Sequence, residues 1–397
     1  MTSTATPISR ARTTRPDADQ DGARSVRTLR VAFVGGGTGG HVVPGLHLLA
    51  DADAREERPQ DLVWFTSGRP VEERVFAGSS VLLGRVSHQR IALPLEARGG
   101  GAPSRTALAL RAPAAVVAAR RALVAHKSEV VLGLGGFTAL PVVVAALGLG
   151  IPTALLEVNA VSGAATRWLG RISQRTFHAF AASATNPSRE VWTGPPLPPE
   201  MMHGAPGRDV VRRARATLGL DPERPVLVIL GGSQGASALN GFVRANLSRL
   251  HAGGVQVLHQ TGPGKQGEAA QSVEAYRAVE YLDPIRTALE AATVVLCRAG
   301  ASTLCEIAAL RIPAFVAPYP RAAKDHQTKN AVELGRGVRL VRDHELGAWT
   351  ADAITRLASD EGATERAVMS AELARAVPLD GAQRIWHELS AMARRNT

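Results

Sequence analysis

A histidine follows directly on a run of glycines near the start of the chain, and together these residues could hold a phosphorylated ligand. Five of the six residues from Gly35 to Gly40 are glycine, and His41 comes next. Glycines let the backbone turn tightly and bring its N–H groups close to an anion. The helix expected to start near Pro44 points the positive end of its dipole at the same place. We therefore expect a phosphate-binding loop whose last side chain, His41, faces the ligand.

An apolar strand must position this loop. Residues 29–34 have the length and β-branched content of a buried parallel strand. Three of the glycines that follow also fit the pattern G-x-G-x-x-G, so an NAD-binding site is an alternative. Such a site needs an Asp or Glu at the end of the second strand to hold the ribose, whereas the expected second strand, 62–66, runs into Ser67. The missing acid counts against NAD.

The composition is that of a globular protein with a strong positive charge. With 397 residues, of which 45% are hydrophobic and 20% charged, the chain is long enough for two domains with a core each. The net charge is +11, but only four of the 46 basic residues are lysines, and no run of arginines alternates with aromatic residues. This argues against nucleic acid as a partner. We expect a basic face toward an anionic membrane or a phosphorylated substrate.

Three further features bear on membrane insertion and metal binding. Residues 1–27 are polar and lack the apolar run of a secretory signal, so we expect a disordered tail. Prolines and glycines interrupt the uncharged stretch 139–156, which predicts a short helix, a turn and a strand instead of a transmembrane helix. Cys297 and Cys305 lack further ligands for a zinc site, and we expect reduced core residues in a cytosolic protein.

Strands and helices alternate along the chain in two halves. Candidate strands lie at 29–34, 62–66, 129–133, 153–156 and 175–179, and then at 225–230, 255–259, 278–282, 293–297 and 313–317. The proline-rich stretch 194–199 separates the halves, and further glycine-rich turns follow strands at 133–137 and 231–236. This pattern predicts two Rossmann-like doubly wound α/β domains, with a ligand in the cleft between their carboxyl ends.

Five motifs resemble, in their order and spacing, the MurG family of cell-wall glycosyltransferases. They lie at 36–45, 133–137, 231–236, 298–306 and 325–330. Enzymes of this family move N-acetylglucosamine from UDP-N-acetylglucosamine to the muramyl sugar of lipid I, which gives lipid II for peptidoglycan synthesis. The resemblance implies a hexosyltransferase that is peripheral to the cytoplasmic face of the bacterial inner membrane. It also implies a part in cell-wall biogenesis, cell division and cell shape.

The resemblance implies the GT-B type of fold and an inverting reaction that uses neither a bound metal nor a cofactor. Helix N-termini and loop amides would then neutralise the UDP diphosphate. The implied parts of the chain are a disordered tail 1–27, an N-terminal acceptor and membrane domain 28–193, a hinge 194–199, a C-terminal UDP-sugar domain 200–378, and a last helix 379–397 that packs back on the N-terminal domain. UDP-N-acetylglucosamine, lipid I and an anionic membrane surface are the implied partners.

His41 is the implied catalytic residue, either as the base that activates the acceptor hydroxyl or as a group that orients the acceptor. The implied donor-binding residues are Thr38, Gly39, Gly40, Asn159, Ser233, Leu282, Ala301, Ser302, Thr303, Leu304, Cys305, Glu306 and Gln327. Gly135, Gly136 and Phe137 would form an acceptor or diphosphate loop. Within the donor set, Glu306 would open a helix and bind the ribose hydroxyls.

Several of these residues also have a purely structural explanation. His41 could only cap the glycine loop, Asn159 could cap a helix, and Gln327 could be an exposed polar loop residue. Glu306, in the first turn of a helix, would be stabilised by the helix dipole regardless of function. Phe137 is of a type that is more often found in the core than in contact with a ligand.

Three positions depart from the family pattern. Leu156 and Val158 stand in place of polar residues, and Pro198 stands in place of an arginine. These departures leave the acceptor open. A related glycosyltransferase with another lipid or small-molecule acceptor is one alternative, and a non-catalytic nucleotide-sugar binding protein is another.

A lipid-linked acceptor implies a membrane-facing surface on the N-terminal domain. The apolar stretch 91–95 supplies apolar groups for it, and nearby cations are Arg98, Arg105, Arg111, Arg120 and Arg121. The alternative is that the helix expected at 104–126 simply packs its leucines inward.

Overall fold

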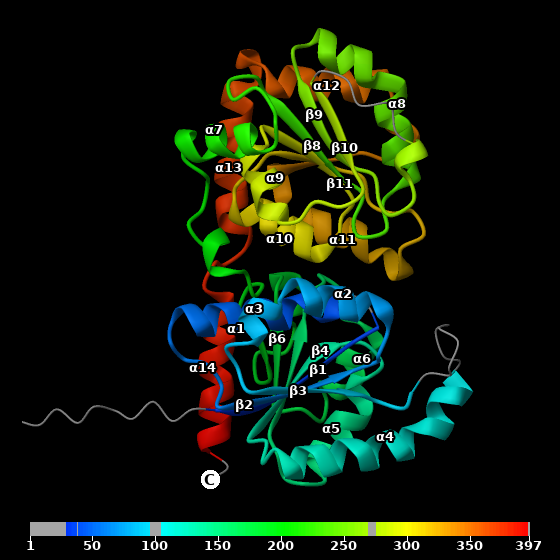
Figure 1. Ribbon diagram of the computed structural model, residues 1–397, viewed down its shortest axis with the longest axis vertical. Helices are drawn as coiled ribbons and strands as arrows, with labels where there is room; N and C mark the ends of the chain where they lie inside the picture. The colour runs from blue at the N-terminus through cyan, green and yellow to red at the C-terminus, as the bar shows by residue number, and fades with distance from the viewer. Residues whose placement is uncertain (1–28, 38, 96–104, 269–274, 396–397) are drawn as a thin grey trace, which may run out of the picture.

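Two parallel α/β domains lie one above the other in the computed structural model, with the N-terminal domain at the bottom of Figure 1. The structure describes residues 29–37, 39–95, 105–268 and 275–395. Each domain has one parallel sheet, and an apolar cluster covers each face of that sheet. The predicted fold class is therefore confirmed.

The N-terminal sheet contains seven strands in the described part of the chain, all parallel, in the order β3-β2-β1-β4-β5-β6-β7. The strands are β1 Arg30–Gly35, β2 Asp61–Thr66, β3 His88–Ala92, β4 Val130–Gly135, β5 Thr153–Glu157, β6 Arg175–His178 and β7 Glu190–Trp192. The helices are α1 Val43–Ala54, α2 Pro70–Gly78, α3 Ser80–Leu83, α4 Arg105–Ala125, α5 Ala139–Leu147 and α6 Ala164–Leu169.

The C-terminal sheet contains six described strands in the order β10-β9-β8-β11-β12-β13, again all parallel. The strands are β8 Val226–Leu230, β9 Gln256–Gln260, β10 Tyr276–Val279, β11 Val294–Cys297, β12 Ala314–Val316 and β13 Val338–Leu340. The helices are α7 Arg208–Thr217, α8 Ser237–Ala252, α9 Ile285–Ala291, α10 Ala301–Ala309, α11 His326–Val332, α12 Ala348–Ala358, α13 Ala363–Ala376 and α14 Gly381–Arg394.

Both sheets reverse their strand order at one point. In each domain the chain begins in the middle of the sheet, adds two strands on one side and then crosses back to continue on the other. The reversal lies between β1 and β4 in the N-terminal sheet, and between β8 and β11 in the C-terminal sheet. Loops at the carboxyl ends of such strands diverge and leave a crevice for a ligand.

The strand prediction is confirmed for the buried strands and wrong at the sheet edges. Three strands were not predicted, namely β3, β7 and β13, and β10 lies at 276–279 instead of 278–282. Four of the five residues of β3 are exposed, so its sequence carries no apolar pattern. The strands β7 and β13 have three residues each, which is too short for a period to be recognised.

Part of the expected membrane surface belongs to the core instead. Leu93 and Leu95 are buried against α4 and β2, so the expectation that 91–95 presents apolar groups to a membrane is wrong. Arg98 lies outside the described residues. None of the helices in the described ranges has the length and apolar character that crossing a bilayer requires.

The end of the chain returns to the N-terminal domain. The helix α14 lies beside α1 (Figure 1). Its residues Ile385, Trp386 and Leu389 join the same buried cluster as Leu46 and Leu49 of α1. A long apolar face of α14 thereby loses contact with water, which stabilises its position beside the helix that follows the first glycine loop.

Candidate active site

Four of the five predicted motifs follow the four strands that flank the two switch points, and the fifth, 325–330, follows β12. β1 and β4 lead into the glycine loops of the N-terminal domain, β8 leads into the loop 231–236, and β11 leads into Arg298 and the start of α10. A small cavity lies where the two domains and the hinge meet. It is lined by Pro44, His47, Val158, Pro195, Pro196, Leu197, Ala301, Ser302, Cys305 and Glu306. One motif from each domain, 36–45 and 298–306, thus contributes to this cavity.

His41 lies at the contact between the two glycine loops of the N-terminal domain. A Cβ on Gly135 would come within 2.8 Å of Cδ2 of the His41 ring, and a Cβ on Gly136 within 3.1 Å of its Nδ1. Both glycines have positive φ, 109° and 83°, which other residues rarely adopt. The second loop therefore needs its glycines to let the imidazole approach.

The tautomer of His41 follows from its backbone partner. Nδ1 lies 2.9 Å from the carbonyl oxygen of Gly36. A carbonyl only accepts, so Nδ1 carries the hydrogen and, in the neutral ring, Nε2 carries the lone pair. Burial lowers the pKa of His41, while the Gly36 carbonyl and the carboxylates of Glu157 and Glu72 raise it, with the net shift downward. The neutral form, which can accept a proton, is favoured at neutral pH.

The remaining residues of the first and second loops have different surroundings. Thr38 lies outside the described residues, Gly39 is half-buried and Gly40 is exposed. Phe137 packs against the apolar cluster between the sheet and α5, and the guanidinium of Arg69 lies over its ring, 5.7 Å from the centroid. Packing against this apolar cluster is therefore one role of Phe137.

Asn159 takes part in a hydrogen-bond chain that joins the two domains. Its side chain donates to Glu157 Oε1 at 3.2 Å and accepts from Nδ2 of Asn330 at 3.2 Å. The fully buried Asn330, in α11, also accepts from the N–H of Ala160 at 2.8 Å. Asn330 is the last residue of the 325–330 motif, but nothing in the sequence indicates its partners Ala160 and Asn159, which are 170 and 171 residues away.

The donor-side residues divide into accessible and buried groups. Ser233 is exposed, whereas Ser302, Thr303 and Gln327 are half-buried. Gln327 is held locally, because its Oε1 accepts from the N–H of Tyr319 at 2.8 Å. Four further residues of the predicted set are core residues, namely Leu282, Ala301, Leu304 and Cys305. Two of these core residues, Ala301 and Cys305, also line the cavity between the domains.

The position of Glu306 corrects one expectation. α10 begins at Ala301, so Glu306 is its sixth residue and lies in the second turn instead of opening the helix. Only 6% of its surface is exposed, and burial raises its pKa to about 8. Its carboxyl group lines the cavity between the domains. A buried carboxyl at that place is suited to bind hydroxyl groups, and the helix-dipole explanation in the first turn does not apply.

The three positions that depart from the family pattern are buried or packed against apolar residues. Leu156 is 2% exposed and belongs to the core, and Val158 packs against the apolar clusters of both domains. Pro198 is buried and precedes a short 3-10 turn at Pro199–Met201, whose last N–H bonds to the Pro198 carbonyl at 2.9 Å. The proline therefore shapes the hinge, and an arginine there would place a charge in apolar surroundings.

Three buried polar residues near the cleft were missed. Glu72 accepts the N–H of Gly37, Glu157 accepts the N–H of Gly163 at 2.8 Å, and Arg298 pairs with Asp343 while donating to the carbonyl of Ala317 at 2.9 Å. Two of the three had a signal in the sequence. Arg298 opens the 298–306 motif, and Glu72 is the third residue of a helix with proline at its first position, where a glutamate often binds the backbone N–H groups.

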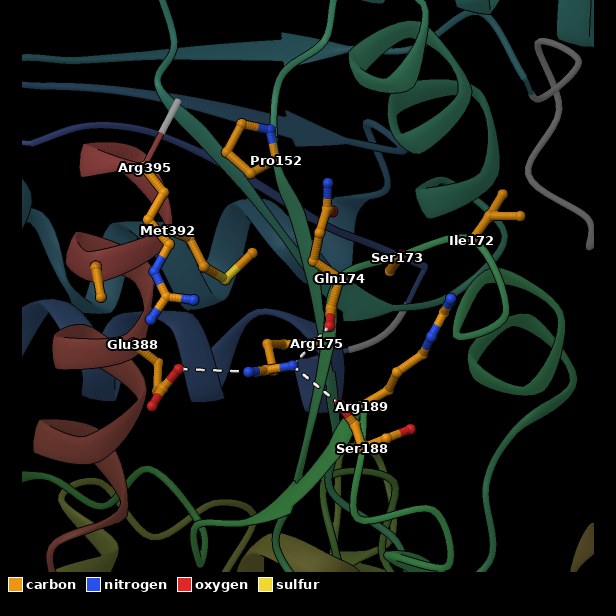
Figure 2. Close-up of a pocket in the computed structure, with 11 residues that line it drawn as sticks. Pro152, Ile172, Ser173, Gln174, Arg175, Ser188, Arg189, Glu388, Met392 and Arg395 are labelled. Atoms are coloured by element: carbon orange, nitrogen blue, oxygen red, sulfur yellow. Dashed lines mark hydrogen bonds and ion pairs between the residues drawn. The ribbon is translucent and has the colours of Figure 1, made fainter. Parts of the chain in front are cut away.

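A larger cavity lies away from this cleft. Figure 2 shows it between α14 and the residues just before β5 and β6, with a volume of about 460 Å³. Arg175, Arg189, Glu388 and Arg395 line it, and Arg175 bonds to the carbonyl of Ser188 at 3.1 Å. It is at the amino ends of the parallel strands and contains none of the predicted site residues. Ligands of open α/β sheets bind at the other edge, so we exclude it as the active site.

No group of three or more His, Cys, Asp or Glu side chains suited to a metal occurs within the described ranges. Both cysteines are free and buried, and burial raises the pKa of the Cys297 thiol to about 12. They are therefore inert core residues at neutral pH.

Two parallel α/β domains whose glycine loops face each other across a hinge define the GT-B class of glycosyltransferases. The chain belongs to glycosyltransferase family 28, because the N-terminal domain of that family matches residues 31–178 and its C-terminal domain matches residues 226–383.

This chain is similar to its curated relatives over nearly their whole length. An enzyme of Paenarthrobacter aurescens (strain TC1) is 36% identical over 86% of this chain and 90% of its own. One of Nocardioides sp. (strain ATCC BAA-499 / JS614) is 35% identical over 90% and 96%. Both are named UDP-N-acetylglucosamine–N-acetylmuramyl-(pentapeptide) pyrophosphoryl-undecaprenol N-acetylglucosamine transferase. The resemblance to the MurG family is confirmed.

Solved structures support the fold. MurG of Acinetobacter baumannii has a TM-score of 0.67 at 23% identity and covers 91% of this chain and 99% of its own. A calicheamicin glycosyltransferase has a TM-score of 0.65 at 18% identity, with 93% and 99% covered. The two scores are close, so the shape of the chain alone does not identify the acceptor.

The burial of Glu306 predicts a pH-dependent loss of stability that one substitution removes. In the unfolded chain the carboxyl ionises near its ordinary pKa of 4.5, whereas the folded protein keeps the proton until about pH 8. The free energy of unfolding therefore falls as the pH rises from about 4.5 to about 8, by up to about 5 kcal/mol. Glu306→Gln should leave the melting temperature unchanged at the acid end of this range and raise it at the alkaline end.

The control is Glu361→Gln, which alters an exposed glutamate and should shift the melting temperature little at any pH. Thermal unfolding followed by circular dichroism across the range compares the three proteins. Parallel pH profiles for wild type and Glu306→Gln would contradict a neutral, buried carboxyl group.

Proposed function

We propose that this chain transfers N-acetylglucosamine from UDP-N-acetylglucosamine to the muramyl sugar of lipid I and so forms lipid II. The observation that carries the proposal is the nearly full-length identity of about a third with relatives whose names state this reaction. The cavity between the domains supports it, because Pro44 from the end of the 36–45 motif and the buried Glu306 from the 298–306 motif both line it. On this proposal, 28–193 is the acceptor and membrane domain and 200–378 is the UDP-sugar domain.

The reaction assigns separate tasks to the residues of the cleft. The acceptor hydroxyl must lose a proton as it attacks the anomeric carbon, and Nε2 of neutral His41 receives it. The UDP diphosphate must gain stabilisation as it departs, and the loop amides with the N-terminus of α10 provide it. Glu306 accepts hydrogen bonds from the ribose hydroxyls. Attack opposite the leaving group makes the reaction inverting.

Transfer assays with purified lipid I test the function. Formation of a lipid-linked disaccharide from UDP-N-acetylglucosamine is the expected result. Transfer of the sugar to another lipid or small molecule, but not to lipid I, would favour the related glycosyltransferase. Binding of the donor without transfer to any acceptor would favour a nucleotide-sugar binding protein. Thermal stabilisation by NAD but not by UDP would overturn all three.

Substitution of His41 should lower the rate of catalysis strongly and the stability of the fold only a little. His41→Ala should lower kcat by at least about a hundredfold, the usual scale for a general base, while the Kd for UDP is unchanged. The lost bond to Gly36 should cost about 1 kcal/mol of stability. Steady-state kinetics and thermal unfolding of the same samples measure both effects.

His251→Ala is the matched control, because His251 is also half-buried and bonds a backbone carbonyl, that of Ala275 at 3.2 Å. It should lose similar stability and keep its kcat. Equal kcat for His41→Ala and His251→Ala would limit His41 to a structural role.

Donor binding should release a proton from Glu306. The carboxyl must be ionised to accept from two ribose hydroxyls, yet the free protein holds its proton until about pH 8. Affinity for UDP should therefore rise with pH, by up to about tenfold per pH unit below that value, and level off above it. Isothermal titration calorimetry between about pH 6 and 9 measures this dependence.

Two comparisons test the assignment to the ribose. Glu306→Ala should bind UDP about thirtyfold to a thousandfold more weakly and lose the pH dependence, because a charged acceptor for two hydroxyls is gone. In wild type, 2′-deoxy-UDP should bind poorly. If the deoxy nucleotide binds as well as UDP, the carboxyl group does not contact the ribose.

A membrane surface on the N-terminal domain belongs to the same proposal. α4 exposes Leu110, Val117 and Val124, which are seven residues apart and lie on one outer stripe, and α5 and α6 expose Leu140 and Trp168. Arg120 and Arg121 are exposed on α4 as well. Apolar groups with cations beside them suit the surface of an anionic bilayer. The inward leucine of α4, Leu123, remains in the core.

Two tryptophans allow a matched test of this surface. Trp168, on the N-terminal domain, is 71% exposed, and Trp349, on the C-terminal domain, is 70% exposed. Trp168→Ser should lower binding to vesicles that contain anionic lipid, while Trp349→Ser should not. Wild-type binding in co-sedimentation should rise with the anionic fraction and fall with salt. Equal losses in both variants, or indifference to lipid charge, would contradict the proposed surface.

A further inference from the structure

We propose that Glu72 is a positioning residue that acts on His41 through the peptide unit between Gly36 and Gly37. The inference rests on the proposed function, in which His41 accepts a proton from the acceptor. Glu72 itself touches neither substrate nor reacting atoms. It holds and polarises the backbone group to which the imidazole is bound.

The carboxylate of Glu72 is surrounded by donors. The side chain lies in the first turn of α2 and is completely buried. One of its oxygens accepts the N–H of Gly37 and the hydroxyl of Ser67, and the other accepts the N–H groups of Gly68 at 2.9 Å and Arg69 at 3.3 Å. An ionised carboxylate accepts only, so this set satisfies it without water.

The first glycine loop connects this carboxylate to His41. The N–H of Gly37 and the carbonyl of Gly36 belong to the same planar peptide unit. The N–H of the unit donates to Glu72, and its carbonyl accepts from Nδ1 of His41 at 2.9 Å. Carboxylate, peptide and imidazole therefore form one continuous chain of hydrogen bonds.

Such a chain makes His41 a better base. A negative charge at the N–H end polarises the peptide, and its carbonyl becomes a stronger acceptor for the Nδ1 hydrogen. This favours the tautomer with the lone pair on Nε2 and stabilises the imidazolium after proton transfer. A carboxylate does the same directly in the Ser-His-Asp triad. Here a peptide unit stands between the two side chains.

The surrounding residues fit this arrangement. A Cβ on Gly36 would lie 2.7 Å from Oε1 of Glu72 and 2.7 Å from the backbone nitrogen of Ser67. Any residue other than glycine at position 36 would therefore collide with the carboxylate. The next carbonyl, of Gly37, accepts from Nη1 of Arg69 at 3.0 Å. Two residues from the start of α2, Glu72 and Arg69, thus bind consecutive peptide units of the loop.

Three charged groups face His41 or its loop. Glu72 approaches from α2 and Glu157 from β5, and both raise the pKa of His41 against the larger, opposite effect of burial. Arg69, at the start of α2, binds the loop at Gly37. Removing the charge of Glu72 should therefore lower the pKa of His41 further and weaken it as a base.

The test is Glu72→Gln, which keeps the shape of the side chain and removes its charge. In the ligand-free protein, the pKa of His41 measured by NMR should fall by at least about 0.5 unit. In turnover, kcat should fall by about tenfold or more with KM for the donor little changed. The control is Glu73→Gln, the neighbouring exposed glutamate that pairs with Arg90 at 2.8 Å, and it should change neither value.

A double substitution shows whether the effect passes through His41. In the His41→Ala background, Glu72→Gln should cause no further loss of kcat, because the group on which it acts is gone. A loss that multiplies with that of His41→Ala would overturn the proposal, and so would an unchanged His41 pKa in Glu72→Gln.

The NMR readouts do not depend on the proposed function. If His41→Ala retained its kcat, the role of His41 as base would fail, while a pKa shift in Glu72→Gln would still establish the hydrogen-bond chain. If Glu72→Gln does not fold, the nitrogen chemical shifts of wild-type His41 test the proposal, because they show which ring nitrogen carries the hydrogen. Neutral His41 should carry its hydrogen on Nδ1, and a hydrogen on Nε2 would overturn the proposal.

Discussion

In each sheet the chain leaves the central strand in one direction and later returns to build the other side, and the placement of the site depends on this reversal. At the reversal, the two neighbouring parallel strands send their connections to opposite faces of the sheet, so their carboxyl ends stay uncovered. β1 and β4 do this in one domain, and β8 and β11 in the other. The carboxyl ends of all four strands carry sequence motifs. Functional groups from distant parts of the chain therefore meet at one cleft.

Burial acts in opposite directions on the pKa values of His41 and Glu306 and favours the neutral form of both residues. It lowers the pKa of His41, and it raises that of Glu306 to about 8. A neutral imidazole is the form that can accept a proton. A neutral carboxyl group costs little to bury, and in the proposed role of Glu306 its ionisation is favoured once ribose hydroxyls provide hydrogen bonds in place of water. The ligand-free protein thus avoids burying an unpaired charge in the cavity between the domains.

The sequence identifies the parts of the site that depend on local pattern. Apolar runs that end in glycines predict β1, β4 and β8, because buried parallel strands need no polar alternation. Contacts between residues far apart are not visible in this way. Nothing near Asn330 or Asn159 indicates that their side chains bond to each other. The position of Glu306 was wrong by one helical turn because a glycine-rich approach to a helix does not fix its first residue.

The chain passes between the two domains twice, and these two connections, called crossings below, lie against each other. Their packing helps to fix the relative position of the domains. One crossing is the hinge at 194–199, and the other joins α13 to α14. A Cβ on Gly194 would lie 2.6 Å from the carbonyl oxygen of Pro378, and a Cβ on Gly381 would collide with that of Pro195. Glycine at both positions lets the two crossings pack backbone to backbone. Because α14 then packs against α1, the helix that follows His41, the second connection ends against the element that carries the first glycine loop.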